Sequence, residues 1–198
     1  MRTTGTGMAH HMRSLRHAQE DEAARRRWQH PESILEGIGL TAGDTFIDVG
    51  CGDGFFALPA ARTVGPRGRV CGIDLNAEAL DLLQEKAFRE GLDNVILHHG
   101  AAEELVLCKG CADVVFFGIS LHDFEDPVRV LANAKRMAGP GGRIVDVDWK
   151  KEPLPLGPPA AKKFSTEHVA SLMAEAGLRV TEITDSGPYH YIVTAMPG

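Results

Sequence analysis

The residues whose types and spacing suggest chemistry most directly are an acid and three glycines within residues 46–56, FIDVGCGDGFF. Asp48 follows an apolar run. Gly50, Gly52 and Gly54 then occupy alternate positions. Because glycine has no Cβ, such a backbone turns sharply and approaches a ligand closely, and a helix that follows offers free N–H groups to an anion. The stretch therefore predicts a nucleotide-binding loop between a buried strand and a helix.

A second acid stands where a nucleotide-binding fold needs one. Residues 70–74, VCGID, have the composition of a strand, and Asp74 closes that strand about 20 residues after the loop. In Rossmann-type folds a carboxylate at this distance accepts hydrogen bonds from the ribose hydroxyls. The glycine spacing is not G-x-G-x-x-G, and the Lys-Ser or Lys-Thr pair of a P-loop is missing after the last glycine. The ordered pair of motifs is more specific than either motif alone.

The pattern D-x-G-x-G-x-G resembles the first motif of the class I methyltransferases that use S-adenosylmethionine. The segment GPGGRIVDVDW resembles the Pro-Gly-Gly turn and the fifth strand of that family, and the resemblance covers about residues 34–195. The segment ISLHDFEDP resembles the stretch after the fourth strand in the small-molecule branch, which includes quinone-biosynthesis and arsenite methyltransferases. The resemblance implies S-adenosyl-L-methionine as cofactor and transfer of its methyl group to a small-molecule acceptor.

The same resemblance implies which residues hold the cofactor. Asp48 would hold the glycine turn and reach towards the amino group of the methionine part. Asp74 would bind both ribose hydroxyls, Leu75 would pack on adenine, and Ile119 would lie near the sulfonium. The family commonly has Asp where this chain has Ala101, so we assign no side-chain contact with adenine there. The implied cofactor-binding residues are Asp48, Gly50, Cys51, Gly52, Gly54, Asp74, Leu75, Ala101, Ala102, Glu103 and Ile119.

Methyl transfer from a sulfonium is an in-line displacement, and the methyl carbon is already activated, so a general base is optional. The two candidate catalytic residues are His122, which follows the fourth predicted strand, and Tyr189, which begins the last one. Histidine titrates near neutral pH and suits proton removal. Strand alternation places Tyr189 and Tyr191 on one face and His190 on the other. The alternative is that His122 caps a loop and that the tyrosines fill the sheet edge. Further candidates at the predicted strand ends are Asp123, Asp146 and Asp148.

The elements that must position these residues alternate between strand and helix. Five such alternations predict an α/β fold with a Rossmann-like, doubly wound and mostly parallel sheet. The stretch 113–117 is apolar throughout, which suits a strand buried on both faces. We expect 139–142 to be a turn before a strand at 143–147. Strands at 179–184 and 189–194 predict an antiparallel C-terminal hairpin. The family resemblance implies seven strands in the order 3-2-1-4-5-7-6.

Length and composition restrict the class of protein. A chain of 198 residues with 43% apolar and 24% charged residues suits one globular domain. The net charge of −6 makes nucleic acid an unexpected partner. No apolar run approaches the roughly 20 residues that span a bilayer, and the N-terminus lacks an apolar signal core. We therefore expect a cytoplasmic protein that does not associate with membranes.

The cysteines raise the question of a metal site. In a cytosolic chain four scattered cysteines are expected to be reduced thiols. Cys108 and Cys111 form a C-x-x-C pair, with His98 and His99 upstream. A structural zinc site needs four ligands and often has two such pairs, whereas only one pair is present. We assign no metal site, and leave open whether this pair or the N-terminal histidines bind a metal.

Residues 1–30 lie outside the alternating pattern, and we predict that they form an arm or lid next to a methyltransferase domain at 31–198. Helix formers dominate 14–28, so that stretch is expected to be helical. A segment that precedes the first strand can fold over the carboxyl ends of the sheet and exclude water from them. Trp28 would then pack on the acceptor side, and the arginines at 25–27 would meet an anionic acceptor. The alternative is a solvated arm that tethers the chain or mediates association.

Three functions stay open from the sequence. The first is a small-molecule methyltransferase, favoured because the chain has neither an appended domain nor an extended basic region. The second is a methyltransferase acting on RNA or protein, supported only by the arginines at 25–27. The third is a non-enzymatic module that keeps the cofactor fold. The acceptor, the use of a general base and the oligomeric state are not determined by these patterns.

Overall fold

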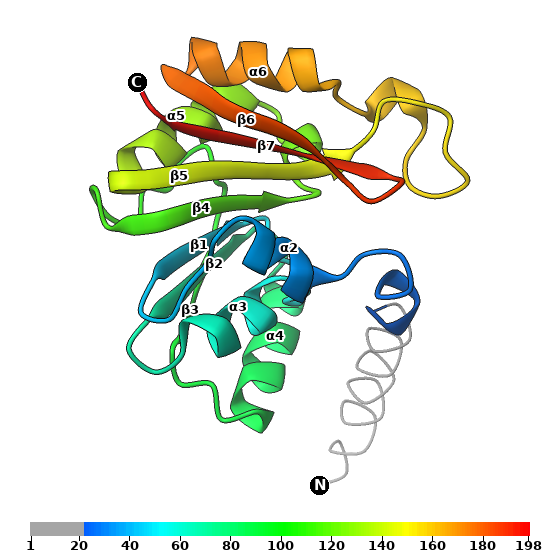
Figure 1. The fold of residues 1–198 in the computed structure, drawn as a ribbon. Helices are drawn as coiled ribbons and strands as arrows, with labels where there is room; N and C mark the ends of the chain where they lie inside the picture. The colour runs from blue at the N-terminus through cyan, green and yellow to red at the C-terminus, as the bar shows by residue number, and fades with distance from the viewer. Residues whose placement is uncertain (1–21) are drawn as a thin grey trace, which may run out of the picture.

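The computed structural model describes residues 22–198, which form a seven-stranded sheet with helices on both faces (Figure 1). The strands are β1 (Thr45–Val49), β2 (Arg69–Asp74), β3 (Val95–His99), β4 (Ala112–Gly118), β5 (Ala138–Trp149), β6 (Leu178–Ser186) and β7 (His190–Pro197). The helices are α2 (Pro31–Gly37), α3 (Ala57–Val64), α4 (Ala77–Arg89), α5 (Pro127–Met137) and α6 (Thr166–Glu175), with two 3₁₀ turns, η1 (Leu121–Asp123) and η2 (Ala160–Lys162).

The sheet has the strand order β3-β2-β1-β4-β5-β7-β6. Strands β1 to β5 pair in parallel, whereas β7 runs antiparallel to both β5 and β6. The doubly wound, mostly parallel Rossmann-like sheet is therefore confirmed, and so is the C-terminal antiparallel hairpin. The order reverses between β1 and β4, and in open α/β sheets ligands bind beyond the carboxyl ends of the strands at such a point.

Two apolar layers hold the sheet between its helices. Successive side chains of a strand point to opposite faces, and β1 shows this directly. Phe46 packs in the layer shared with α2, α3 and α4, whereas Ile47 packs in the layer shared with α5 and α6. Both residues are fully buried. The carboxyl end of β1 is thus fixed from both sides, and the loop that follows it has a rigid support.

Short polar residues begin the helices that flank the site. The Asn76 side chain accepts a hydrogen bond from the N–H of Ala79 at the start of α4. Asp126 caps α5 in the same way, and Pro127 occupies its first turn. Such caps satisfy backbone N–H groups that have no partner within the helix. Helix α4 therefore begins directly after β2, and α5 begins after the loop and the turn η1 that follow β4.

The expected turn at 139–142 is wrong. These residues belong to β5, which begins at Ala138 and bulges where Ala112 pairs with Ala138 and Val114 pairs with Arg143. A Cβ on Gly142 would lie 2.4 Å from the carbonyl oxygen of Ala112, so only glycine lets the strand run this close. The glycine and proline residues therefore mark a bulge within the strand and not its start.

The expectation of four free thiols is also wrong. Cys108 and Cys111 form a disulfide in the loop that leads into β4. Cys51 and Cys71 are free and buried. No cluster of histidine, cysteine or acidic residues that could hold a metal ion occurs among residues 22–198. The C-x-x-C pair is thus a covalent link across one short turn.

Candidate functional site

The loop after β1 has the backbone that its glycines allow. Gly50, Gly52 and Gly54 have φ angles of 77°, 53° and 97°, which favour glycine. A Cβ on Gly50 would lie 2.6 Å from the Cβ of Ser120, and one on Gly54 would lie 2.4 Å from a methyl group of Leu83. Around Gly52, apart from Gly52 and its two chain neighbours, no atom of the described chain lies within 4 Å of such a Cβ. Gly50 and Gly54 are thus required by packing, and the surface of the loop is open at Gly52.

Asp74 connects the second strand to the glycine loop. Its Oδ2 accepts a hydrogen bond of 2.7 Å from the N–H of Gly52, and its Oδ1 accepts one of 2.8 Å from the N–H of Asn76. A carboxylate oxygen has lone pairs for more than one donor, so both oxygens can still accept hydroxyl groups. Asp74 therefore holds the loop in place and also faces the space beside it.

Asp48 is a buried acid with an unused acceptor. Its side chain is 2% exposed, and its Oδ2 has no hydrogen-bond partner within residues 22–198. Burial, followed by the negative charge of Asp74, raises the pKa of Asp48 to about 7, while Arg25 opposes this rise. A buried carboxylate without a partner is costly, so this position is suited to a cationic hydrogen-bond donor.

A pocket of about 290 Å³ opens between the ends of β1, β2 and β4. It contains five of the implied cofactor residues, namely Gly50, Asp74, Leu75, Ala102 and Ile119. The Leu75 side chain is 65% exposed, which is unusual for a large apolar residue and suits contact with a flat ring. Ile119 has a φ of 62°, a strained backbone for a β-branched residue and a feature that clusters at functional sites.

The other implied residues surround this pocket or lie behind it. Ala101 and Glu103 line an adjoining pocket of about 490 Å³, which Leu75 also borders. The backbone oxygens of Ala102 and Glu103 accept hydrogen bonds of 3.0 and 2.9 Å from the Asn133 side chain, which fixes this loop. The Cys51 side chain is buried in the core and does not line either pocket.

Two residues of the pocket were missed by the sequence patterns. Ser120 donates a hydrogen bond of 2.7 Å from its hydroxyl to the carbonyl of Val49, and it sits against Gly50. Phe124 lines the pocket after η1, with its ring against Phe117. Both residues reach the site through contacts distant in sequence. Both residues belong to the recognised segment ISLHDFEDP, but neither residue type by itself indicates a role in the site.

His122 forms a pair with an acid of β5. Its Nδ1 lies 2.7 Å from Oδ2 of Asp148, and Asp148 also accepts a hydrogen bond from the N–H of Trp149. Burial works to lower the pKa of His122, but the hydrogen bond and charge of Asp148, together with the charge of Asp123, raise it overall. The Nε2 atom lies 3.6 Å from Asp123. An imidazole oriented by a buried carboxylate is an arrangement used for proton transfer.

Tyr189 lies in an aromatic cluster at the ends of β5 and β7. The ring centroid of Trp28 lies 5.2 Å from that of Trp149, 5.4 Å from that of His190 and 6.5 Å from that of Tyr189. Tyr189 precedes β7, so it does not share a face with Tyr191 as strand alternation predicted. Its ring instead contacts Trp28, as the ring of His190 does. Tyr191 lies on the other face, where its hydroxyl donates to the carbonyl of Phe164.

Residues 22–30 lie on the side of the sheet towards which the arrowheads of β4 and β5 point (Figure 1). Of the helix predicted at 14–28, residues 22–25 are helical and residues 26–28 form a turn. The remaining part, 14–21, lies outside the described residues. Glu22 pairs with Lys86 of α4 at 3.4 Å. The guanidinium of Arg25 stacks 3.8 Å from the ring centroid of Phe55, directly after the glycine loop. The segment therefore crosses the carboxyl edge from α4 to β5.

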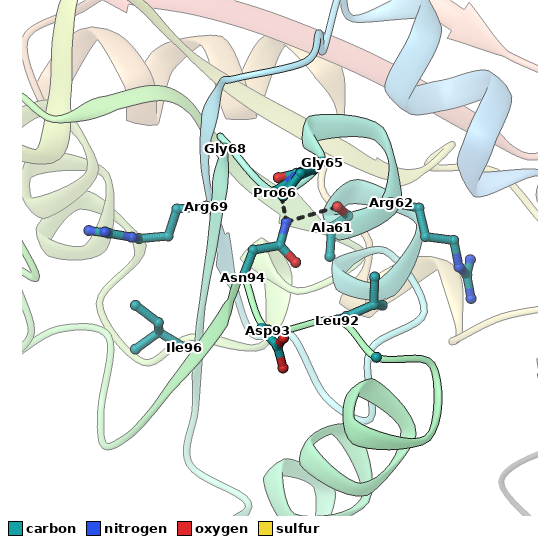
Figure 2. A pocket seen from close by; sticks show the side chains of 11 residues that line it. Ala61, Arg62, Gly65, Pro66, Gly68, Arg69, Leu92, Asp93, Asn94 and Ile96 are labelled. Atoms are coloured by element: carbon teal, nitrogen blue, oxygen red, sulfur yellow. Dashed lines mark hydrogen bonds between the residues drawn. The ribbon is translucent and has the colours of Figure 1, made fainter.

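A separate cavity of about 440 Å³ lies at the opposite edge of the sheet, between α3, α4 and the starts of β2 and β3. Figure 2 shows the side chain of Asn94 donating to the carbonyls of Ala61 and Gly65, both at 2.9 Å. Arg62, at its rim, pairs with Glu90. Because this edge carries the amino ends of the strands, this cavity is not the candidate site.

The fold and the site define a class of protein, an α/β enzyme that binds a nucleoside cofactor beyond the ends of β1 and β2. Residues 40–193 match the family described as a methyltransferase domain, which is more than half of the chain. The chain therefore belongs to the S-adenosylmethionine-dependent methyltransferases of class I.

Solved structures and curated proteins support this assignment. A methyltransferase of Aquifex aeolicus that depends on S-adenosylmethionine is 32% identical, with a TM-score of 0.84 over 88% of this chain and 93% of that one. A demethylmenaquinone methyltransferase of Halalkalibacterium halodurans is 31% identical over 63% of this chain and 51% of its own length. The chain thus spans about half the length of the curated relatives it matches. An arsenic(III) methyltransferase of Chlamydomonas reinhardtii, at 24% identity over 80% of this chain and 66% of that one with a TM-score of 0.63, shares the fold.

The residues present fit S-adenosyl-L-methionine, the cofactor of this family. The unpartnered Oδ2 of Asp48 suits the ammonium group of the methionine part, and the open surface at Gly52 lets a ligand approach the backbone. Asp74 has acceptors for ribose hydroxyls, and Leu75 offers an exposed apolar surface for adenine. Residues 40–193 thus form a domain of the methyltransferase family, and the pocket beside Gly50 and Asp74 lies at the carboxyl edge of its sheet. Among residues 22–198 no helix is long and apolar enough to cross a membrane.

Proposed function

We propose that the protein transfers the methyl group of S-adenosylmethionine to a small-molecule acceptor held at the carboxyl edge of the sheet beneath residues 22–30. The observation that carries this proposal is the cover over that edge. Trp28 packs on Trp149 and His190, and Arg25 packs on Phe55, which supports a role of the segment as a cover beside the glycine loop. An acceptor that reaches the methyl group under such a cover must be small, and the cover also excludes water.

We further propose His122 as the base for an acceptor that loses a proton. When bound, S-adenosylmethionine supplies an activated methyl group whose bond to sulfur breaks as the acceptor attacks in line, leaving S-adenosylhomocysteine. Asp148 holds the imidazole of His122 by its Nδ1, so Nε2 is the atom that receives the proton. Tyr189 is a second candidate for contact with the acceptor, because its ring belongs to the aromatic cluster of the cover.

An acceptor that is RNA or protein is less well supported, because the arginines at 25–27 do not form a basic surface together. Arg25 stacks on Phe55, and burial is the main reason that its pKa falls to about 10. Arg26 pairs with Glu22 and Glu32, at 3.0 and 2.9 Å. Of the three, only Arg27 is exposed. Together with the net charge of −6, this leaves little attraction for a polyanion.

Among small molecules, an aromatic hydroxyl compound is favoured over arsenite. The curated relatives include demethylmenaquinone methyltransferases, and the Trp28 ring packs on Trp149 at the same edge of the sheet, which supports an aromatic acceptor. Arsenite chemistry requires several accessible thiols. Here Cys51 and Cys71 are buried, burial raises the pKa of both thiols, and Cys108 is tied to Cys111. A cytoplasmic location for this reaction stays a prediction.

The experiment is an acceptor screen that measures S-adenosylhomocysteine formed from S-adenosylmethionine. The panel contains a reduced naphthoquinone with an unsubstituted ring position, simple phenols, arsenite with excess thiol, total RNA and a bacterial protein extract. We expect turnover with a member of the aromatic group and background rates with RNA and protein. Turnover confined to RNA or protein would overturn the proposed acceptor class, while leaving the methyltransferase assignment intact.

A further inference from the structure

Arg25 has a buried guanidinium nitrogen that the described chain leaves without a partner. Its Nε donates a hydrogen bond of 2.7 Å to Oε1 of Gln29, and its flat face lies over Phe55. The Nη2 atom is buried and has no hydrogen-bond acceptor among residues 22–198. Burial lowers the pKa of Arg25 to about 10, against the charges of Asp53, Asp48 and Glu22, so the group is still a cation at neutral pH. A buried guanidinium with a free N–H is costly unless an anion binds it.

Asp48 is the complementary group on the other side of the glycine loop. It is 2% exposed, and its Oδ2 is likewise without a partner in the described part of the chain. Arg25 and Asp48 affect one another's pKa, so they are close enough to interact. They nevertheless form no direct ion pair among the pairs found in residues 22–198. Two complementary groups, each with one unpartnered atom, thus lie close enough to interact without forming an ion pair.

A zwitterion would satisfy both groups at once. Its ammonium group donates to the free oxygen of Asp48, and its carboxylate accepts from the free nitrogen of Arg25. The amino-acid end of S-adenosylmethionine is such a zwitterion, and it belongs next to the glycine loop, where Phe55 supports the guanidinium. We infer that Arg25 is a cofactor-binding residue, which binds the carboxylate of the amino-acid end of S-adenosylmethionine while Asp48 binds its ammonium group.

The surrounding contacts hold Arg25 in place for this role. Gln29 is 2% exposed and fixes the guanidinium through its Oε1. Three residues after Arg25, the ring of Trp28 is stacked on His190 and lies against Trp149. The segment 22–30 therefore completes the cofactor site and does not only cover the acceptor. The inference assigns Arg25 to the cofactor and leaves recognition of the acceptor to the aromatic cluster.

The test compares three ligands that differ only in the amino-acid end. S-adenosylhomocysteine has both charges, its decarboxylated analogue keeps only the ammonium group, and 5′-methylthioadenosine has neither. Calorimetry with the full chain should show that Arg25→Ala weakens S-adenosylhomocysteine roughly ten- to a hundredfold, the effect of losing a hydrogen bond between charged groups. The variant should bind the decarboxylated analogue and 5′-methylthioadenosine as the wild type does. Asp48→Asn should weaken both ligands that carry the ammonium group and spare 5′-methylthioadenosine.

Two further variants make the result decisive. Arg27→Ala removes an exposed arginine from the same segment and should change no affinity. Arg25→Lys keeps the positive charge but not the planar guanidinium. Of the three ligands, only S-adenosylhomocysteine should bind this variant more weakly than the wild type. This variant tests the role of Arg25 even if Arg25→Ala does not fold.

The inference is overturned if Arg25→Ala or Arg25→Lys leaves S-adenosylhomocysteine unchanged, or if it weakens all three ligands equally, as a purely structural role would. It rests on S-adenosylmethionine as cofactor. Failure of the wild type to bind any of the three ligands would instead contradict that assignment.

Discussion

At the residue scale, the sequence revealed the groups whose types form a motif. Asp48, Gly52 and Asp74 are recognisable because a motif fixes their order along the chain. Ser120 and Arg25 are not recognisable in this way, because their roles arise from contacts with residues far away in sequence. At Gly54 the missing Cβ also makes room for Leu83, a packing requirement that the motif does not indicate.

The pair formed by His122 and Asp148 leads to a prediction about pH. With the acceptor found in the screen, His122→Ala should lower kcat by roughly 10²- to 10⁴-fold and leave the affinity for S-adenosylhomocysteine unchanged. The neutral imidazole is the base, so the wild-type kcat should rise with pH and level off above the pKa of His122. Asp148→Asn removes the charge that raises this pKa, so the rise should move to lower pH. Full turnover by His122→Ala would mean that His122 only caps the loop.

Asp146 gives a prediction about stability. Its side chain is completely buried, at 0% exposed. Neither carboxylate oxygen has a hydrogen-bond partner in residues 22–198. Burial, followed by the charge of Asp148, raises its pKa well above the usual value. In the unfolded chain Asp146 ionises near pH 4 but in the folded chain it does not, so its contribution to stability is present at low pH and falls as pH rises towards the folded pKa.

Replacing this acid by its neutral isostere should remove that loss. Asp146→Asn should therefore unfold at a higher urea concentration than wild type at pH 8, and the advantage should shrink at pH 5. The slope expected within this window is about 1.4 kcal/mol per pH unit. Equal differences in unfolding free energy at the two pH values would show that Asp146 ionises normally in the folded protein.

At the element scale, apolar runs and capping residues located the strands and helices, because burial and caps leave direct traces in the sequence. Strand β1 and helix α5 have the bounds that such patterns indicate. The start of β5 was misplaced because Gly and Pro usually end a strand, whereas here they form a bulge against Ala112. The path of residues 22–30 depends on packing of Trp28 that no local pattern encodes.

The glycine loop can be tested with a matched pair of variants. Gly52 and Gly43 both have positive φ angles, 53° and 97°, and in both cases no described atom lies within 4 Å of an added Cβ. Valine at either position should strain the backbone by roughly 1–2 kcal/mol. Only Gly52→Val should also abolish binding of S-adenosylhomocysteine in calorimetry, because its side chain enters the space of the ligand. Equal affinities for the two variants would show that the ligand does not approach Gly52.

Residues 22–30 can be removed as a unit. A chain that begins at Pro31 should keep its far-UV dichroism, bind S-adenosylhomocysteine roughly ten- to a hundredfold more weakly through the loss of Arg25, and lose most methyl transfer. In the full chain, cofactor with acceptor should slow tryptic cleavage after Arg27, the exposed arginine of the segment. Full activity in the shortened chain would reduce the segment to a tether.

At the scale of the whole molecule, the order of the strands decides where the site lies. The alternation of strands and helices indicated a doubly wound sheet, but periodicity alone does not order parallel strands, and the order followed from the family resemblance. The reversal between β1 and β4 opens the carboxyl edge, where the glycine loop, Asp74 and residues 22–30 meet. The cavity in Figure 2 lies at the amino edge, where nothing in the sequence pointed to chemistry.

The most direct measurement is calorimetry of S-adenosylhomocysteine with wild type, Asp74→Ala and Asp113→Ala. Asp113 is the matched control, because it accepts a hydrogen bond of 2.8 Å from the N–H of Thr45 at the opposite edge of the sheet. S-adenosylhomocysteine should bind the wild type, Asp74→Ala should weaken it roughly ten- to a hundredfold, and Asp113→Ala should leave it unchanged. NAD and ATP should give no binding heat. An affinity that Asp74→Ala does not alter, or equal binding of NAD, would contradict a cofactor site for S-adenosylmethionine at this edge.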